Sequence, residues 1–501
     1  MKKTIIIATT IAFSLFLSSI AFKGEKINDE WNKEFEGLGI SIFNDIKPTS
    51  DGYIIAGETA VPGIVEYQGW LVKIDKDGNE IWEKYYGSGF LSTVLEIEDG
   101  YIAIGKTSFD GWLLKVDKEG NEIWNKSFGW KKDDYFNNGI KTKDGGYLMV
   151  GVTHCIENIT FPYGDVLVLK TDKEGNLEWY NHFDGNNDGD IGYDVIEIDD
   201  GYLISGSTVI SISERWDAWL IKIDKKGNEI WNKTYGWSGG RYLVLHSYIK
   251  EIEDGDIIIA GDVCVPPADT NRAYLIKLDK EGNEIWKKIY GEGTYEMRAG
   301  QWIEGFEITK DGFILYGFTF DYSIGNWDGW LLKVDKEGNE LWNKSFGRRW
   351  EEKIEGVVVL EDGYICVGKT EHKWGYGLGW ILKCNDLPPP KMKIIKPKEN
   401  CLYIFDREIV PYDRTLIIGA ITITVEVDKP EKINRVEFYL DHYNQFDNIP
   451  EKIDYSPPYE WKCRAIGFGL LPCHLAVGVY YGNSGAVAAG RMVIYIINLV
   501  P

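Results

Sequence analysis

The sequence predicts an all-β protein, a seven-bladed β-propeller closed by its N-terminal strand and followed by an Ig-like β-sandwich. Three observations lead to this prediction. A unit made of a Gly-Trp-Leu-Leu-Lys strand, an Asp-Lys-Glu-Gly-Asn turn and an Ile-Trp-Asn-Lys strand recurs along the chain. One copy of its last part stands alone before the first full unit, and the repeat stops at a Pro-rich segment. Repeats of this length are typical of propellers, solenoids or arrays.

Each repeat is expected to supply four strands. The first precedes an Asp-Gly turn, the second reads Tyr-Ile-Ile-Ala-Gly, and the third and fourth flank the Asp-Lys-Glu-Gly-Asn turn. That turn suits a hairpin, with Asp117 at the first position of a type I turn and Gly120 at the left-handed bulge position. The segments are rich in β-branched and aromatic residues and show no helical periodicity, which favours strands throughout the repeat region.

The count of each part predicts closure. The third strand occurs seven times and the Asp-Gly segment also seven times, but Trp-Asn-Lys follows the third strand only six times. Its missing copy is residues 31–37, ahead of the first unit. In a ring, a strand from the start of the chain can complete the last blade and leave no open edge. We therefore predict that residues 30–36 pair with residues 379–384.

The repeat also carries a resemblance to known families. The spacing of Asp75, Gly78 and Trp82 is similar to the Trp-docking repeat of quinoprotein propellers of the pyrroloquinoline-quinone type, one residue shorter in the turn. The whole unit resembles repeats of exported bacterial and archaeal propeller proteins, some of which carry an endoglucanase label. The resemblance covers residues 29–385 and implies a fold. Quinone-dependent dehydrogenases carry eight blades and a Cys-Cys disulfide, so seven predicted blades without a Cys-Cys pair argue against quinone chemistry.

The N-terminus and the charge predict an extracellular protein. Lys2 and Lys3 followed by an apolar run over residues 4–22 predict a signal peptide. The run is also long enough to span a bilayer, so an uncleaved anchor is the alternative. Either places the protein outside the cell or on the outer face of the cell membrane. A net charge of −23 argues against nucleic acid or anionic lipid as a partner.

A second domain is expected after the linker at residues 386–390. Residues 391–501 contain longer strands separated by turn residues, the pattern of a β-sandwich. Segments 435–441 and 456–461 resemble bacterial Ig-like domains appended to secreted glycosidases and adhesins. Cys463 and Cys473 are the predicted disulfide, because export permits oxidation. Buried free thiols are the alternative.

The loops predict where a ligand binds. The connections from the fourth strand to the next blade, and from the second strand to the third, are long and different in every blade, and function in repeat scaffolds concentrates on such loops. They hold Trp, Arg and acidic residues outside the repeat, which suit stacking on a ligand and fixing its orientation. Packing of these Trp residues onto the blades is the alternative. The predicted ligand-binding face comprises Trp130, Asp133, Asp134, Trp237, Arg241, Arg298, Trp302, Trp327, Arg348, Trp350 and Trp374.

The predicted function is a non-catalytic binding protein that presents this face to an extracellular glycan or protein ligand. The first alternative is a polysaccharide-acting enzyme, an endoglucanase-like glycoside hydrolase, which needs two carboxylates flanking the scissile bond. Acidic residues are too plentiful to choose such a pair, so no catalytic residue is predicted. The second alternative is a structural envelope component. A deep axial cleft with paired acids would favour the enzyme, and a shallow aromatic face the binder.

One loop has metal-ligand spacing. Residues 184–190 place oxygen ligands at positions 1, 3, 5 and 7 with Gly at position 6, as a calcium loop does, although position 12 is Val195 rather than Glu. A solvated acidic loop is the alternative. The predicted calcium ligands are Asp184, Asn186, Asp188 and Asp190, and no other cofactor is expected.

Overall fold

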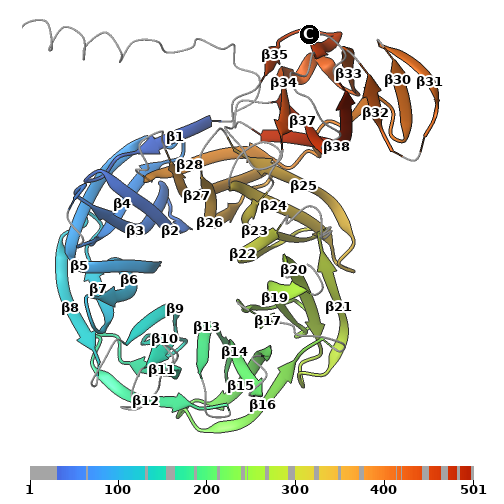
Figure 1. Ribbon diagram of the computed structural model, residues 1–501. Helices are drawn as coiled ribbons and strands as arrows, with labels where there is room; N and C mark the ends of the chain where they lie inside the picture. Colours follow the sequence, from blue (N-terminus) through green and yellow to red (C-terminus); the bar gives the residue numbers. More distant parts are fainter. Residues whose placement is uncertain are drawn as a thin grey trace, which may run out of the picture.

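The structure is a computed structural model, and its described part is almost entirely β-strand (Figure 1). Its one helical element is the short 3-10 turn η1 (Pro430–Lys432). The described residues are 31–63, 66–129, 134–153, 164–185, 189–211, 215–237, 243–244, 246–265, 270–291, 300–320, 327–347, 351–371, 377–404, 406–412, 414–418, 420–442, 451–463, 472–481 and 486–497.

Antiparallel strands form successive four-stranded units around a ring, the arrangement of a propeller (Figure 1). Strand β5 is long enough to be the outer strand of unit 1 and the innermost strand of unit 2. The first three units, from the innermost strand outward, are β2 (Ile40–Pro48), β3 (Gly52–Ala60), β4 (Gln68–Asp75) and β5 (Glu80–Ile97); β5, β6 (Gly100–Thr107), β7 (Gly111–Val116) and β8 (Glu122–Phe128); and β9 (Tyr135–Lys141), β10 (Tyr147–Thr153), β11 (Asp165–Thr171) and β12 (Leu177–Phe183).

The remaining units continue the same order, with a short extra strand, β17 (Leu243–Val244), between units 4 and 5. They are β13 (Asp190–Ile198), β14 (Gly201–Ser211), β15 (Arg215–Asp224) and β16 (Glu229–Tyr235); β18 (Tyr248–Glu251), β19 (Ile257–Val265), β20 (Thr270–Leu278) and β21 (Glu284–Tyr290); β22 (Gly300–Thr309), β23 (Gly312–Phe320), β24 (Asp328–Asp335) and β25 (Glu340–Phe346); and β26 (Glu352–Val359), β27 (Gly363–Glu371) and β28 (Gly377–Asn385), to which β1 (Trp31–Phe35) is added.

The repeated turn has the predicted geometry. Gly120 has φ +78°, in the left-handed region, and its N–H donates to the Asp117 carbonyl. The Asp117 carboxylate accepts the N–H groups of Glu119 and Asn121, so one side chain holds the whole turn. The backbone and the carboxylate therefore explain why Asp, Gly and Asn recur at fixed offsets.

The predicted pairing of the N-terminal strand is confirmed. Strand β1 pairs antiparallel with β28, from Trp31 opposite Lys383 to Phe35 opposite Gly379. The ring of Trp31 packs over Gly78 in the turn of unit 1, where an added Cβ would lie 2.6 Å from the indole. The Lys33 ammonium donates to the Asp77 carbonyl at 2.7 Å. Trp and Lys of one unit thus hold the turn of the next.

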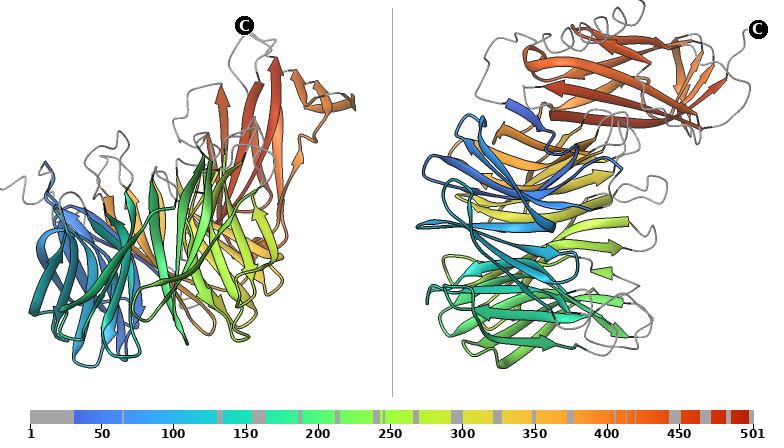
Figure 2. Two further views of the ribbon diagram at one scale, coloured as in Figure 1. Left: turned by 90° about the horizontal axis from the view of Figure 1, so that it is seen from below. Right: turned by 90° about the vertical axis from the view of Figure 1, so that its left-hand side faces the viewer.

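Residues 392–497 form the second region, which lies beside the propeller near β25 and β28 (Figure 1) and stands outside the ring in two further views (Figure 2). Two sheets share one core that contains Ile423, Phe438 and Val477. The larger sheet is joined to the propeller where β38 pairs with β25. The smaller sheet has the order β29-β33-β36, and the other strands belong to the larger sheet. The strands of the region are β29 (Met392–Lys396), β30 (Cys401–Ile404), β31 (Arg407–Pro411), β32 (Leu416–Ile418), β33 (Ile421–Val427), β34 (Ile433–His442), β35 (Lys452–Asp454), β36 (Tyr459–Cys463), β37 (Pro472–Tyr481) and β38 (Ala486–Ile497).

Candidate functional site in the axial pocket

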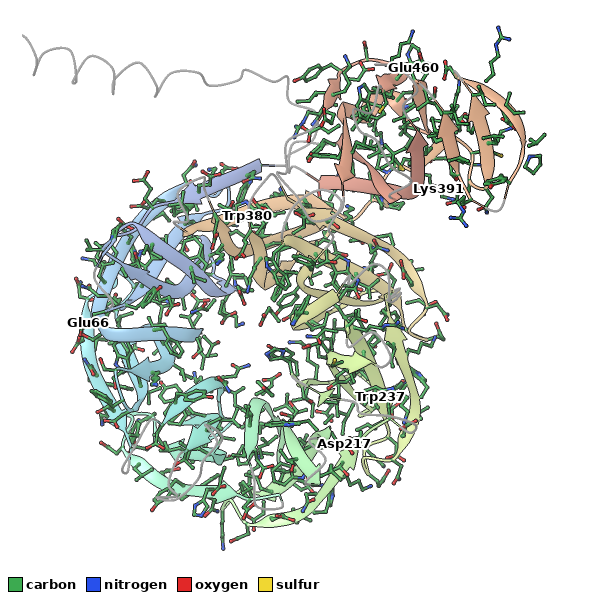
Figure 3. The ribbon with its side chains drawn as sticks, in the orientation of Figure 1. Glu66, Asp217, Trp237, Trp380, Lys391 and Glu460 are labelled. Atoms are coloured by element: carbon green, nitrogen blue, oxygen red, sulfur yellow. The ribbon has the colours of Figure 1, made fainter. Side chains whose placement is uncertain are left out.

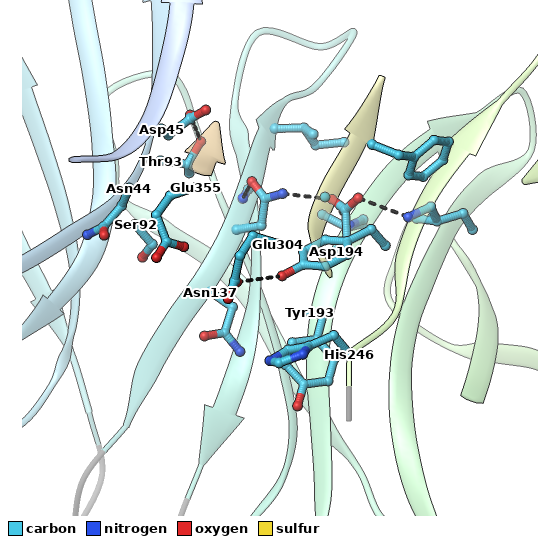
Figure 4. Close-up of a pocket in the computed structure, with 18 of the residues that line it drawn as sticks. Asn44, Asp45, Ser92, Thr93, Asn137, Tyr193, Asp194, His246, Glu304 and Glu355 are labelled. Atoms are coloured by element: carbon cyan, nitrogen blue, oxygen red, sulfur yellow. Dashed lines mark hydrogen bonds between the residues drawn. The ribbon is translucent and has the colours of Figure 1, made fainter. Parts of the chain in front are cut away.

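A cavity of about 570 Å³ lies where the units converge. The innermost strands of units 1 to 4, 6 and 7 contribute to its wall, and unit 5 contributes β18 with the preceding His246. A volume of this size lies within the range of small-ligand pockets. Because every unit supplies part of the wall, the cavity is on the propeller axis, and Figure 4 shows the side chains that project into it.

β-Bulges place the side chains that line this axial pocket. In six units the innermost strand has one extra residue relative to its neighbour, so the extra residue lacks a ladder partner. A bulge re-aims its side chain, and here each of the extra residues lines the pocket. They are Asn44, Ser92, Asn137, Tyr193, Glu304 and Glu355.

A glycine of the repeat accompanies each bulge. Gly151 ends the Tyr-Leu-Met-Val-Gly copy of the second strand, and an added Cβ there would lie 1.9 Å from the Tyr135 carbonyl oxygen. Gly317 and Gly368 stand in the same relation to the carbonyls of Trp302 and Lys353. The backbones approach too closely for any side chain, so the repeated Gly permits the bulged wall of the pocket.

Units 1 to 3 supply neutral side chains that also connect neighbouring units. The Asn44 amide donates to the Leu91 carbonyl at 3.0 Å, and the Ser92 hydroxyl to the Phe136 carbonyl at 2.6 Å. The Asn137 amide donates to the Gly192 carbonyl at 2.8 Å. These bonds hold one half of the wall in a fixed arrangement.

Units 4 and 5 supply aromatic rings and a histidine. The ring of Tyr193 lies 5.1 Å from that of His246 and 6.4 Å from that of Tyr248. His246 Nδ1 lies 2.6 Å from the buried carboxylate of Asp262. Burial alone lowers the pKa of His246, but Asp262 outweighs it and raises that pKa to about 9. His246 is therefore a cation at neutral pH.

Units 6 and 7 supply paired acids. The Tyr248 hydroxyl donates to Glu304 at 3.5 Å, and Glu355 is close enough to Glu304 for their charges to interact. Burial and, second, the Glu304 carboxylate raise the pKa of Glu355 to about 8. Burial also raises the pKa of Glu304. At neutral pH one acid of the pair therefore carries a proton, which suits proton donation to a ligand.

A second row of side chains sets the charge of the pocket. Lys47 pairs with Asp45 at 2.7 Å, and Lys250 pairs with Glu307 at 3.0 Å. Burial raises the pKa of the Glu58 carboxyl to about 7. Six carboxyl groups and two lysines line the pocket, so carboxyl groups outnumber cations even when His246 is counted. Protonation of Glu355 and of part of Glu58 at neutral pH makes the net negative charge smaller than this count.

The structure describes only part of the predicted ligand-binding face. Asp134 and Trp237 are buried, and the Trp237 ring packs at 5.0 Å against Tyr274 in the ring wall (Figure 3). Because the Trp237 ring is buried, it packs in the core and is not available to stack on a ligand. Trp130, Asp133, Arg241, Arg298, Arg348, Trp350 and Trp374 lie outside the described residues.

Trp302 and Trp327 of the predicted face do come together. Their rings are 4.6 Å apart, and Trp302 stacks on Phe318 at 5.3 Å. Trp327 also lies 4.7 Å from Phe320. We call Trp302, Phe318, Phe320 and Trp327 the unit 6 aromatic cluster. Both Trp residues are half-buried, so the rings pack on one another and keep some exposed area.

The remaining predicted sites are described in part. Asp184 and Asp190 lie near each other with Asp165, whereas Asn186 and Asp188 are outside the described residues. Cys463 is buried at the end of β36 and Cys473 lies on β37, but the Cys473 side chain is not among those described. The predicted disulfide stays a prediction.

Comparisons with known proteins give distant likenesses. No protein-family model and no curated protein matches the chain. A polysaccharide lyase described as PL25 ulvan lyase is 9% identical, with 70% of this chain and 95% of that chain covered and a TM-score of 0.45. The β-propeller domain of the Trilobed protease from Pyrococcus furiosus is 13% identical, with 69% and 94% covered and a TM-score of 0.39. Fibronectin(III)-like modules of Clostridium thermocellum CbhA are 19% identical over 22% of this chain and 98% of that chain, with a TM-score of 0.15. None of the described segments is a helix of the length and hydrophobicity needed to cross a bilayer.

Proposed function

We propose that this protein is exported and binds a neutral or positively charged glycan segment in the axial pocket of a seven-bladed propeller closed by β1. The pairing of β1 with β28 and the packing of Trp31 on Gly78 support closure. The contribution of all the units to one cavity supports the blade count. The Ig-like identity of residues 391–501 and the signal peptide are part of the same proposal.

The observation that carries the proposal is the composition of the pocket wall. Tyr193, Tyr248 and His246 supply ring surfaces, while Asn137 and Glu304 supply groups that can bond hydroxyls. Ring faces with a few convergent polar groups are the usual means of holding a polar ligand in a pocket of this volume. The excess of carboxyl groups disfavours a polyanionic glycan and favours a neutral or amino-sugar chain.

The test compares the pocket with the unit 6 aromatic cluster. Neutral, amino-sugar and acidic oligosaccharides are screened on an array, and the best ligand is titrated against the wild type, Tyr193→Ala and Trp327→Ala. We expect Tyr193→Ala to weaken binding at least about tenfold, roughly 1.4 kcal/mol, with Trp327→Ala unchanged. If Trp327→Ala alone weakens binding, the ligand binds at the loop face and not in the axial pocket. Selective binding of acidic chains would contradict the charge argument.

A second candidate is hydrolysis of the bound glycan. It is favoured because Glu355, whose pKa of about 8 keeps it protonated at neutral pH, lies in the same pocket as a second acid, Glu304, and a glycosidase works with two such groups. Reducing ends released from the array-selected oligosaccharide by the wild type, and lost in Glu355→Gln and Glu304→Gln, would establish it. Unchanged ligand after prolonged incubation would leave the binding function alone.

A further inference from the structure

Three carboxylates meet away from the axial pocket, where unit 3 adjoins unit 4. Asp165 begins β11, Asp184 follows β12, and Asp190 begins β13. One carboxylate oxygen from each lies within 4.8 Å of the others. Asp165 and Asp190 are buried, whereas Asp184 is exposed. Three like charges at this separation repel one another unless a proton or a cation compensates them.

Asp165 is the member of the cluster to which none of the described residues donates a hydrogen bond. Its side chain is 8% exposed, and among the described residues His182 acts on it through charge and not through a hydrogen bond. The Asp190 carboxylate, by contrast, accepts the Gly185 N–H at 2.6 Å. A buried carboxylate without a donor is strongly unfavourable. One oxygen of this carboxylate lies within 4.8 Å of oxygens of two further acids, so a cation that pairs with Asp165 there would contact all three.

The repeat shows what is special about unit 3. Asp110 lies directly before the third strand of unit 2, and its carboxylate lies against Gly129 just after the fourth strand, where an added Cβ would be 2.0 Å away. Asp328 and Gly347 repeat this arrangement in unit 6. In unit 3 the residue at the glycine position is Asp184. Unit 3 therefore has an additional carboxylate, that of Asp184, at a position where units 2 and 6 have glycine.

The main chain holds the third acid in place. The Asp190 N–H donates at 2.7 Å to the carbonyl of Gly164, the residue before Asp165. In unit 2 the Asp134 N–H makes the corresponding bond to the Phe109 carbonyl, so Asp110 and Asp134 reproduce the Asp165 and Asp190 positions without a third acid. Unit 2 is thus an internal control for the cluster.

We propose that Asp165, Asp184 and Asp190 bind one hard divalent cation, calcium, that links unit 3 to unit 4. Calcium prefers carboxylate oxygens, accepts several of them in irregular geometry and completes its shell with water or carbonyls. Asp165 adds a ligand from outside the loop of residues 184–190, whose spacing alone predicted calcium. The cation neutralises the repulsion within the cluster and ties the start of β11 to the start of β13.

The test uses the full chain after removal of metal with EDTA. Equilibrium dialysis and thermal melting with calcium, magnesium or manganese are compared for the wild type, Asp165→Asn and the matched control Asp110→Asn. At about 100-fold excess over Kd we expect calcium to raise the Tm of the wild type and of Asp110→Asn by roughly 5 °C. Asp165→Asn should lose this response and bind one calcium fewer. Asp165-dependent binding of magnesium or manganese would support the same site.

A second variant guards against misfolding. Asp184→Gly restores the glycine of the repeat at an exposed position, so it should fold and also lose the calcium response. The proposal is overturned if no divalent cation moves the wild-type melting curve and dialysis finds none bound. It is likewise overturned if Asp184→Gly and Asp165→Asn respond to calcium as the wild type does, since the cation then binds elsewhere.

Discussion

Glu355 takes its properties from its position on a bulge. The extra residue in β26 directs this side chain into the axial pocket, where burial and Glu304 raise its pKa to about 8. The pKa of Glu355 is lowered by three neighbouring cations, but less than burial and Glu304 raise it. These cations are Lys353, Lys369 and His246. A carboxyl whose pKa is raised on folding keeps its proton in the native state and releases it on unfolding. The protonation of Glu355 therefore makes the free energy of unfolding depend on pH.

The first prediction is a pH dependence. Between the unfolded pKa of about 4.3 and about pH 8, the folded state binds more protons at Glu355 than the unfolded state, so this residue's contribution to stability falls as pH rises. Glu355→Gln cannot titrate, and its Tm advantage over the wild type should grow from about pH 5 to about pH 8. Thermal melting of both proteins across this range checks it. A Tm difference independent of pH would contradict the prediction.

The second prediction concerns the glycine opposite a bulge. Gly151→Ala forces a methyl group toward the Tyr135 carbonyl, 1.9 Å from the ideal Cβ, and should cost more than about 2 kcal/mol. Gly377→Ala is the matched control in a strand, because its Cβ would meet nothing closer than 3.6 Å. Denaturant unfolding of both variants measures the difference. Equal stabilities would show that the bulge does not depend on glycine.

At the scale of the element, β1 occupies the outer position beside β28 in unit 7. Trp31 and Trp286 are both half-buried and both pack over the turn glycine of the following unit, Gly78 and Gly338. The flanking lysines also agree, since Lys288 donates to Asn339 at 2.8 Å as Lys33 does to Asn79. The N-terminal strand therefore makes the same contacts as an internal strand that the chain supplies in order.

The third prediction follows from this equivalence. Trp31→Ala and Trp286→Ala should each lower the free energy of unfolding by about 2–3 kcal/mol, because each removes one ring from the same kind of interface. Chemical denaturation of the two variants and the wild type tests it. If Trp286→Ala destabilises and Trp31→Ala does not, β1 does not close the ring.

At the scale of the whole molecule, the C-terminal region is attached to the propeller at units 6 and 7. Strand β38 extends the sheet of unit 6 through Ser345 and Phe346, and Tyr481 packs against the core shared by units 6 and 7. Among the residues that the structure describes, none from this region lines the axial pocket. Its core is separate, centred on residues such as Ile423 and Phe438.

The fourth prediction is that the two regions are separable in function. Deletion of residues 391–501 exposes the edge of β25 and the surface under Tyr481, so the propeller should lose thermal stability. Ligand affinity at the axial pocket should stay within about twofold of the full chain. Calorimetric titration of both forms measures this. A loss of affinity with an intact fold would place part of the site in the C-terminal region.

The sequence by itself determined the strands, the turns and the partner of β1, because each depends on residues that recur at fixed offsets. Asp117 and Gly120 define a turn locally, and the displaced copy of Trp-Asn-Lys required a partner strand near residues 379–384. The repeated Gly of the second strand also carried a signal for the bulges, since a glycine inside a strand marks close backbone approach. The repeated Gly therefore indicates which residues of the neighbouring innermost strand lie on a bulge and face the axial pocket.

The tertiary structure alone decided which side chains meet. Asn44, Tyr193 and Glu355 are hundreds of residues apart at the extremes and converge only because the units surround one axis. Asp165 joins Asp184 and Asp190 through the adjacency of two units, which the spacing within one loop cannot show. Trp237 has an aromatic ring of the kind that stacks on ligands, yet this ring is buried in the wall of the propeller. Recurrence along a chain fixes local geometry, whereas burial and proximity depend on how the units close around each other.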